Sequence, residues 1–200
     1  MADDNKSEPR SIVDYVESKI VSIYVNDFTE PSAKSFYEGI KQAQNTGQRV
    51  IPVFIDSYGG FCDELVVMMD LIEASPIPVA TIAVGKAMSC GSVLLTCGAS
   101  GMRFIAPTAR VMVHHVASMA WGKVPDMKVA VEETDRLQQL LFTKMAKNCK
   151  KPDNYFLDIL KERGNTDWYL TPAECFKHGI VDEIKIPRLE TEVRVKHRFV

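Results

Sequence analysis

The sequence predicts an α/β domain with a mostly parallel sheet flanked by helices. Runs of β-branched residues alternate with stretches of helical apolar spacing through residue 95, which is typical of successive strand–helix units around a parallel sheet. Turn residues cluster between these runs, at 45–47, 56–60 and 85–91. Because loops at the carboxyl ends of parallel strands gather at one edge of the sheet, we expect the glycine-bearing turns 57–60 and 85–91 to lie together.

Strands in the first half of the chain are expected over 19–25, 49–55 and 79–84. A helix is expected from Glu30 to the turn at 45–47, because threonine and proline mark its start. Pro52 predicts that the second strand is an edge strand or that the proline stands at its start, since proline cannot donate to a ladder. The segment 63–73 is apolar nearly all round, which predicts a buried helix.

The second half predicts one long helix among shorter elements. Short strands are expected over 102–105, 110–114, 167–170 and 180–184, and short helices over 152–163 and 171–178. From Val124 an apolar stripe at three-to-four spacing continues to Met145, so this helix is longer than the average in globular proteins. It either projects from the core to meet a partner subunit or packs across its own domain.

Composition favours one domain of a cytoplasmic protein. The chain has 200 residues with 46% hydrophobic content and a net charge of −2, which suits a single core and gives no electrostatic footprint for nucleic acid or an anionic membrane. The N-terminus is too polar for a signal peptide. We expect a polar tail over 1–9, the domain over 10–185 and a charged tail over 186–200. The five cysteines show no C-x-x-C spacing, so we expect reduced thiols and neither a disulfide framework nor a zinc site.

Ser89 is the first candidate for chemistry. It follows Gly85 in a small-residue turn between an apolar strand and an expected helix. A hydroxyl at a helix N-terminus lies near unpaired backbone N–H groups that can stabilise an oxyanion. On this turn alone, a serine that merely packs a strand-to-helix turn is an equally good interpretation.

Several segments in one order resemble the ClpP family, the proteolytic subunits of Clp proteases (S14 serine peptidases with a crotonase-like fold). The resemblance covers about residues 10–185 and depends on the serine turn 85–91 together with three further segments, which are S-Y-G-G at 57–60, the block 98–114 ending in His114, and D-W-Y-L-T at 167–171 with the closing G-I-V-D at 179–182. Each segment is weak alone, whereas the ordered set is specific. It implies a ClpP-like fold with one long projecting handle helix.

The resemblance also implies roles for individual residues. Ser89 would be the nucleophile, His114 the general base and Asp167 the carboxylate that orients the histidine. The backbone N–H groups of Gly60 and Cys90 would form the oxyanion hole. The residues expected to flank a substrate peptide are Phe61, Cys62, Val116 and Ala117. Asp153, Asp158 and Asp182 are alternatives for the acidic position, and only the ungapped spacing to 179–182 selects Asp167.

The activity implied is that of a serine endopeptidase that cuts unfolded proteins and short peptides through an acyl-enzyme, with no metal and no organic cofactor. The family implies heptameric rings, stacked as a tetradecamer by the long helix and supplied with substrate by an AAA+ unfoldase. The chain has no G-x-x-x-x-G-K-[ST] loop, so ATP would have to be used by that partner. The alternatives are a ClpP-like viral head-maturation protease, a non-catalytic structural subunit of a mixed ring, and an acyl-CoA enzyme of the wider fold.

Three features depart from the family pattern. Tyr58 stands where the oxyanion turn has proline, and the segment 115–122 lacks the family's Q-P and its glycine-bearing loop. The stretch before residue 10 is shorter than the family's axial loops.

His115 follows His114 directly, so in a strand it points to the opposite face and is expected to be structural or exposed.

Overall fold

A computed structural model describes residues 20–189. The tail predicted over 1–9, residues 10–19 of the predicted domain, and residues 190–200 lie outside the described residues. The predicted domain boundaries therefore stay a prediction.

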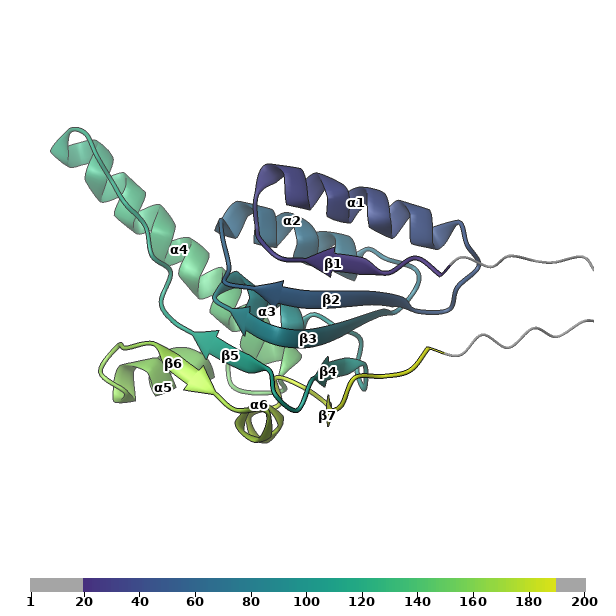
Figure 1. Ribbon diagram of the computed structural model, residues 1–200. Coiled ribbons are helices and arrows are strands. Elements are labelled where there is room, and N and C mark those ends of the chain that lie inside the picture. Colours follow the sequence, from purple (N-terminus) through teal and green to yellow (C-terminus); the bar gives the residue numbers. More distant parts are fainter. Residues whose placement is uncertain (1–19, 190–200) are drawn as a thin grey trace, which may run out of the picture.

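The described residues form a mostly parallel sheet, as the alternation of elements predicts (Figure 1). The pairs β1–β2, β2–β3, β3–β4, β3–β5 and β4–β7 are parallel, and β5–β6 is antiparallel. The strands are β1 (Ile23–Val25), β2 (Ile51–Ser57), β3 (Val79–Met88), β4 (Arg103–Ile105), β5 (Arg110–Val113), β6 (Trp168–Leu170) and β7 (Glu183–Ile184). β3 contacts three other strands and is the centre of the sheet.

Helices flank the sheet, and one of them leaves it. The helices are α1 (Glu30–Gln44), α2 (Cys62–Glu73), α3 (Cys90–Thr96), α4 (Val124–Asn148), α5 (Tyr155–Glu162) and α6 (Pro172–His178). α1 and α2 lie side by side on one side of the sheet, while α4 extends well beyond it (Figure 1). All four buried residues of α4 fall between Leu141 and Ala146. The second half of α4 therefore packs on the domain, and its first half projects from it.

Three elements differ from the sequence prediction. β3 continues through the expected turn as far as Met88, because β5 pairs with its last residues. β2 is not an edge strand, because it pairs with both β1 and β3. Pro52 is tolerated because it lies one residue before Val53, where β1 begins to pair, so its missing N–H removes no ladder bond to β1. α2 is not buried all round, since Val67 is 47% exposed.

Candidate active site

Ser89 lies in a strained turn between β3 and α3. Its φ of 53° and ψ of −121° fall outside the regions that non-glycine residues ordinarily occupy. The surrounding backbone holds it there: Ser89 N donates to Met112 O on β5 at 2.9 Å, and Ser89 O accepts from Ser92 N at 2.9 Å. Strain of this kind persists only where neighbouring contacts over-determine the backbone, and it gathers at functional sites.

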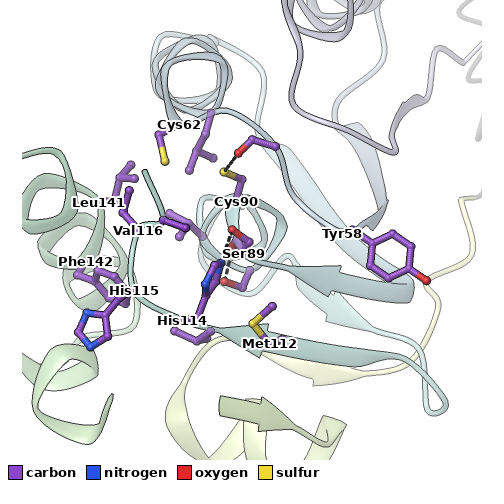
Figure 2. A pocket seen from close by; sticks show the side chains of 16 residues that line it. Tyr58, Cys62, Ser89, Cys90, Met112, His114, His115, Val116, Leu141 and Phe142 are labelled. Carbon is purple, nitrogen blue, oxygen red and sulfur yellow. Dashed lines mark hydrogen bonds between the residues drawn. The ribbon is translucent and has the colours of Figure 1, made fainter. Parts of the chain in front are cut away.

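His114 reaches Ser89 from the adjacent strand. β5 runs parallel to β3 with Met112 opposite Met88, so the residues that follow the two strand ends lie close together. His114 Nε2 is 2.8 Å from Ser89 Oγ (Figure 2). This distance allows a neutral imidazole to take the hydroxyl proton, which is what a serine needs to become a nucleophile.

Asp167 lies in register with His114, but its carboxylate is not bonded to the imidazole. β6 pairs antiparallel with β5 and sets Val113 opposite Trp168. The next pair along this register is His114 and Asp167, and directly opposed residues project from the same face. Asp167 is exposed, and no hydrogen bond joins it to His114 within residues 20–189. The structure thus places Ser89 and His114 within hydrogen-bonding distance of each other, whereas the expected third member, Asp167, makes no hydrogen bond to His114.

The glycine turn that follows β2 meets the serine turn, as expected from the sheet edge. A Cβ on Gly59, whose φ is +112°, would lie 2.7 Å from Ser89 Cβ. A Cβ on Gly60 would lie 2.5 Å from Phe28 O, so both positions require glycine for close approach. The N–H of Gly60 donates to no acceptor within the described residues. The N–H of Cys90 is at the first residue of α3, where helices leave their donors unpaired.

A cavity of about 280 Å³ opens beside Ser89 (Figure 2). Three of the four residues expected to bind a peptide line it, namely Cys62, Val116 and Ala117. Phe61 is not among the lining residues, and its N–H donates to Phe28 O at 2.8 Å. The sequence analysis missed the contribution of α4, which supplies Leu141 and Phe142. Their signal was the apolar stripe in the second half of that helix.

The thiols of Cys62 and Cys90 face the same cavity and interact. Cys90 Sγ donates to Gly60 O at 3.3 Å. The neighbouring Cys90 thiol lowers the pKa of Cys62. The same interaction raises the pKa of Cys90, and burial raises it further. Cys90 is therefore held as a neutral thiol beside Ser89 and is a poor nucleophile at neutral pH.

His115 joins three elements instead of facing Ser89. Its Nδ1 lies 3.0 Å from Gln138 Oε1 on α4, and its Nε2 lies 3.1 Å from Asn165 Oδ1 in the loop before β6. These contacts agree with the structural role predicted for His115 from its position directly after His114. They tie the projecting helix to the loop that leads to Asp167.

No helix within residues 20–189 combines the length and the apolar character that crossing a membrane requires. In the same part of the chain, no three His, Cys, Asp or Glu side chains are grouped as metal ligands would be.

A sheet that presents a strained serine within hydrogen-bonding distance of a histidine has the architecture of a serine hydrolase. Residues 9–188 match the model of the Clp protease family, described as Clp protease. The ATP-dependent Clp protease proteolytic subunit of Deinococcus radiodurans is 32% identical over 142 residues, which cover 71% of this chain and 67% of that protein. The ATP-dependent Clp protease proteolytic subunit 1 of Rhodococcus jostii is 31% identical over 137 residues, which cover 68% of this chain and 60% of the relative.

This chain belongs to the Clp protease family. The resemblance drawn from the four sequence segments and the α/β fold expected from it are both confirmed. Members of this family are serine-type peptidases, so the expected enzyme class is confirmed as well. The aligned part spans 67% of the length of the first relative and 60% of the length of the second.

Proposed function

We propose that this chain is the proteolytic subunit of a Clp-type protease and hydrolyses peptide bonds through an acyl-enzyme at Ser89. The observation that carries the proposal is the 2.8 Å contact between Ser89 Oγ and His114 Nε2 at a strained turn. A serine that only packed a turn would need neither a histidine aimed at its hydroxyl nor a glycine backbone pressed against it. Family membership supports the same reaction.

Each residue of the proposed site has a separate task. His114 takes the proton from Ser89 Oγ as the hydroxyl attacks the scissile carbonyl, and it later gives that proton to the leaving amine. Asp167 orients the imidazole and stabilises its charged form once its carboxylate reaches His114. The N–H groups of Gly60 and Cys90 bind the oxyanion of the tetrahedral intermediate.

The cavity beside Ser89 supports a preference for apolar side chains in the substrate. Val116, Leu141 and Phe142 contribute apolar surface to it, and burying an apolar side chain there is favourable by about 25 cal/mol per Å². The extended segment that carries Val116 and Ala117 offers the substrate backbone a strand to pair with.

The projecting half of α4 supports assembly into a closed chamber. Val124, Val129 and Val131 on this half are 60%, 64% and 63% exposed, and contact with a partner subunit would remove this apolar area from water. We infer that these residues pack against the same helix of a facing subunit and that heptameric rings stack into a tetradecamer. The names of both relatives support an ATP-dependent unfoldase as the partner that delivers polypeptides. The five free cysteines of the described residues suit a reducing compartment such as the cytoplasm.

The proposal is tested by labelling the full chain with a fluorophosphonate and mapping the modified peptide by mass spectrometry. We expect one modification, at Ser89, and none in Ser89→Ala. Hydrolysis of a short fluorogenic peptide should fall by about 10⁶-fold in the same variant. Absence of labelling in a folded, assembled protein would overturn the enzymatic role and favour a structural subunit.

Native mass spectrometry of the same sample tests the chamber. We expect a particle of fourteen subunits, and we expect Val129→Glu to reduce it to single rings, since a charge would be buried at the ring-to-ring contact. Val67→Glu introduces the same charge at another exposed valine, on α2, and should keep the assembly. A Val129→Glu protein that still forms the full particle would contradict the role of α4.

A further inference from the structure

The turn that carries Gly60 lacks a rigid residue of its own. It reads Ser57-Tyr58-Gly59-Gly60, and both glycines have positive φ, at 112° and 156°. Glycine loses more conformational freedom on ordering than any other residue. An oxyanion donor must already point at the developing charge. Bonds from Gly59 N–H to Ser57 Oγ at 3.0 Å and from Phe61 N–H to Phe28 O at 2.8 Å hold the two ends of the turn, which leaves the Tyr58 side chain as a further point of attachment.

Tyr58 is held from outside the turn by a lysine. Lys86 Nζ lies 4.4 Å from the centroid of the Tyr58 ring, which is within the range of a cation–π interaction. Tyr58 is 73% exposed, and its ring points away from Ser89 (Figure 2). The ring is therefore the part of the turn that Lys86 contacts, and it makes no contact with Ser89 or His114.

Lys86 is itself fixed by the neighbouring strands. Its Nζ lies 2.7 Å from Asp56 Oδ1, and Tyr24 OH on β1 donates to Asp56 Oδ2 at 3.2 Å. The sheet makes room for this contact at Gly85, where a Cβ would lie 2.9 Å from Asp56 Oδ1. The register between β2 and β3 shifts between Ile55 and Ser57. The three polar residues thus come from three adjacent strands, β1, β2 and β3.

Both members of the ion pair stay charged at neutral pH. The hydrogen bond from Lys86 lowers the pKa of Asp56, and the same bond raises the pKa of Lys86. The cation that faces the Tyr58 ring is therefore present throughout the pH range in which a serine peptidase with a histidine base works.

We propose that Lys86 is a positioning residue that, anchored by Asp56 and Tyr24, holds Tyr58 and thereby aims the Gly60 N–H at the oxyanion. Lys86 does not touch the substrate. It adds a side-chain anchor at Tyr58 to the backbone bonds that already hold the turn, which is the task that a proline at position 58 would perform by its fixed φ. The inference rests on the proposed function, because it assigns a cause to the oxyanion geometry of that site.

The test is the steady-state kinetics of Lys86→Met in the full chain, with a fluorogenic peptide as the probe. We expect kcat to fall by about 2- to 5-fold, the factor that an exposed cation–π contact supports, with KM unchanged. Lys86→Arg should restore kcat, because a guanidinium keeps both the charge and the stacking. Lys185→Met is the matched control, since Lys185 also pairs with a carboxylate and lies over an aromatic ring, that of Phe104, far from Ser89. We expect its kcat to equal that of the unmodified chain.

A double-mutant cycle separates positioning from general destabilisation. Tyr58→Leu removes the ring at an exposed position, and we expect it to lose the same factor in kcat as Lys86→Met, with no further loss in the double variant. Additive losses, or a change in KM alone, would overturn the inference. A kcat of Lys86→Met equal to that of Lys185→Met would overturn it too. If the unmodified chain neither labels at Ser89 nor cleaves peptide, the proposed function fails, which is a different outcome.

Discussion

The two sides of the candidate site differ in how firmly the fold holds them. Ser89 and His114 follow β3 and β5, two neighbouring strands, and the backbone N–H of Ser89 is bonded to β5 itself. Asp167 precedes β6, a strand of three residues that pairs only with β5. The loop before it contains Asn165 at a positive φ of 59°. Ser89 and His114 thus belong to the centre of the sheet, and Asp167 belongs to its margin.

This difference teaches which contact in the site is easiest to change. Moving Ser89 away from His114 would require breaking the pairing of β3 with β5. Moving Asp167 requires a rearrangement of an exposed loop, which is held by the contact between Asn165 and His115 and by the bond from Asn165 N–H to Leu160 O at 2.8 Å. Stability is lowest where few backbone bonds and few buried contacts hold a segment. The orientation of Asp167 is therefore the feature of the candidate site that depends most on the residues packed around it.

The largest effect expected from this comparison is that of Asp167→Asn. The variant keeps the shape of the side chain and removes the charge that stabilises the imidazolium, so we expect kcat for a short peptide to fall by about 10⁴-fold. That is about 100-fold less than the loss expected for Ser89→Ala. Asp153→Asn changes an equally exposed aspartate and should retain full activity. Unchanged kcat in Asp167→Asn would show that another group orients His114.

A smaller loss is expected on the rigid side, from Gly59→Ala. The added methyl group would crowd Ser89 Cβ at 2.7 Å, so we expect the oxyanion geometry to be lost and kcat to fall by about 10²- to 10³-fold. Gly101→Ala is the control, because Gly101 also has a positive φ, +79°, but nothing lies within 4 Å of the added atom. It should lower the melting temperature and leave kcat unchanged. Equal kcat in the two variants would mean that the turn tolerates movement.

Stability should respond most to Arg103, which ties the C-terminal segment to β4. Its guanidinium donates to Asp182, to Gly179 O at 2.7 Å and to Asn148 O at 3.1 Å. We expect Arg103→Met to lower the free energy of unfolding by about 3–5 kcal/mol, because Asp182 would lose its charged partner and keep the backbone N–H of residue 103, while the carbonyls of Gly179 and Asn148 would lose their donor. Arg136→Met, which breaks an exposed ion pair, should cost under about 1 kcal/mol. Denaturant unfolding of both variants measures the difference, and similar losses would contradict the anchoring role.

The same ion pair predicts a loss of stability in acid. Burial by itself would raise the pKa of Asp182, but the hydrogen bonds from Arg103 outweigh it, so the folded-state pKa lies below the usual value. The stabilisation is then complete above the pKa of the unfolded chain, about 3.9, and is lost as pH falls through the folded-state value. We expect Arg103→Met to be less sensitive to acid than the unmodified chain.

The smallest effect expected is a difference in reactivity among the cysteine thiols. It reports on the cavity beside Ser89 and His114, the side of the site that the fold holds firmly. The lowered pKa of Cys62 means that its thiolate forms at a lower pH than that of an ordinary cysteine, and the side chain is half-buried at an open cavity. Burial raises the pKa values of Cys97, Cys149 and Cys175 to about 12 each. Iodoacetamide at pH 7.5, roughly one unit below an ordinary thiol, should therefore modify Cys62 first, as read by peptide mapping. Faster modification of Cys149 would contradict this order.

Much of the fold followed from local patterns. Strand and helix segments came from hydrophobic periodicity, and the end of α6 came from Gly179, which adopts φ +77° as a helix-terminating glycine does. Errors arose where pairing overrode local signals. Gly85 predicts the end of β3, yet β5 extends pairing to Met88. Pro52 predicts an edge, yet β2 is flanked on both sides because β1 begins one residue later.

The chemistry of the site was less accessible from local patterns. Ser89 could be picked out because a serine between a strand and a helix is a local feature. The cluster of Lys86, Asp56 and Tyr58 left no signal, because its members interact across strands whose register is unknown beforehand. The Gln138 contact of His115 likewise joins residues from a strand end and a distant helix.

By itself the sequence determined the class of the fold, the family, and the identities of the nucleophile and base candidates, since each depends on residue types at fixed short spacings. Only the tertiary structure decided that Ser89 Oγ lies 2.8 Å from His114 Nε2 while the Asp167 carboxylate makes no hydrogen bond to that imidazole, and that Lys86 lies over the ring of Tyr58. The physical reason is that side-chain geometry between strands depends on register, bulges and loop strain. These are set by the packing of the whole domain and leave no periodic trace in the chain.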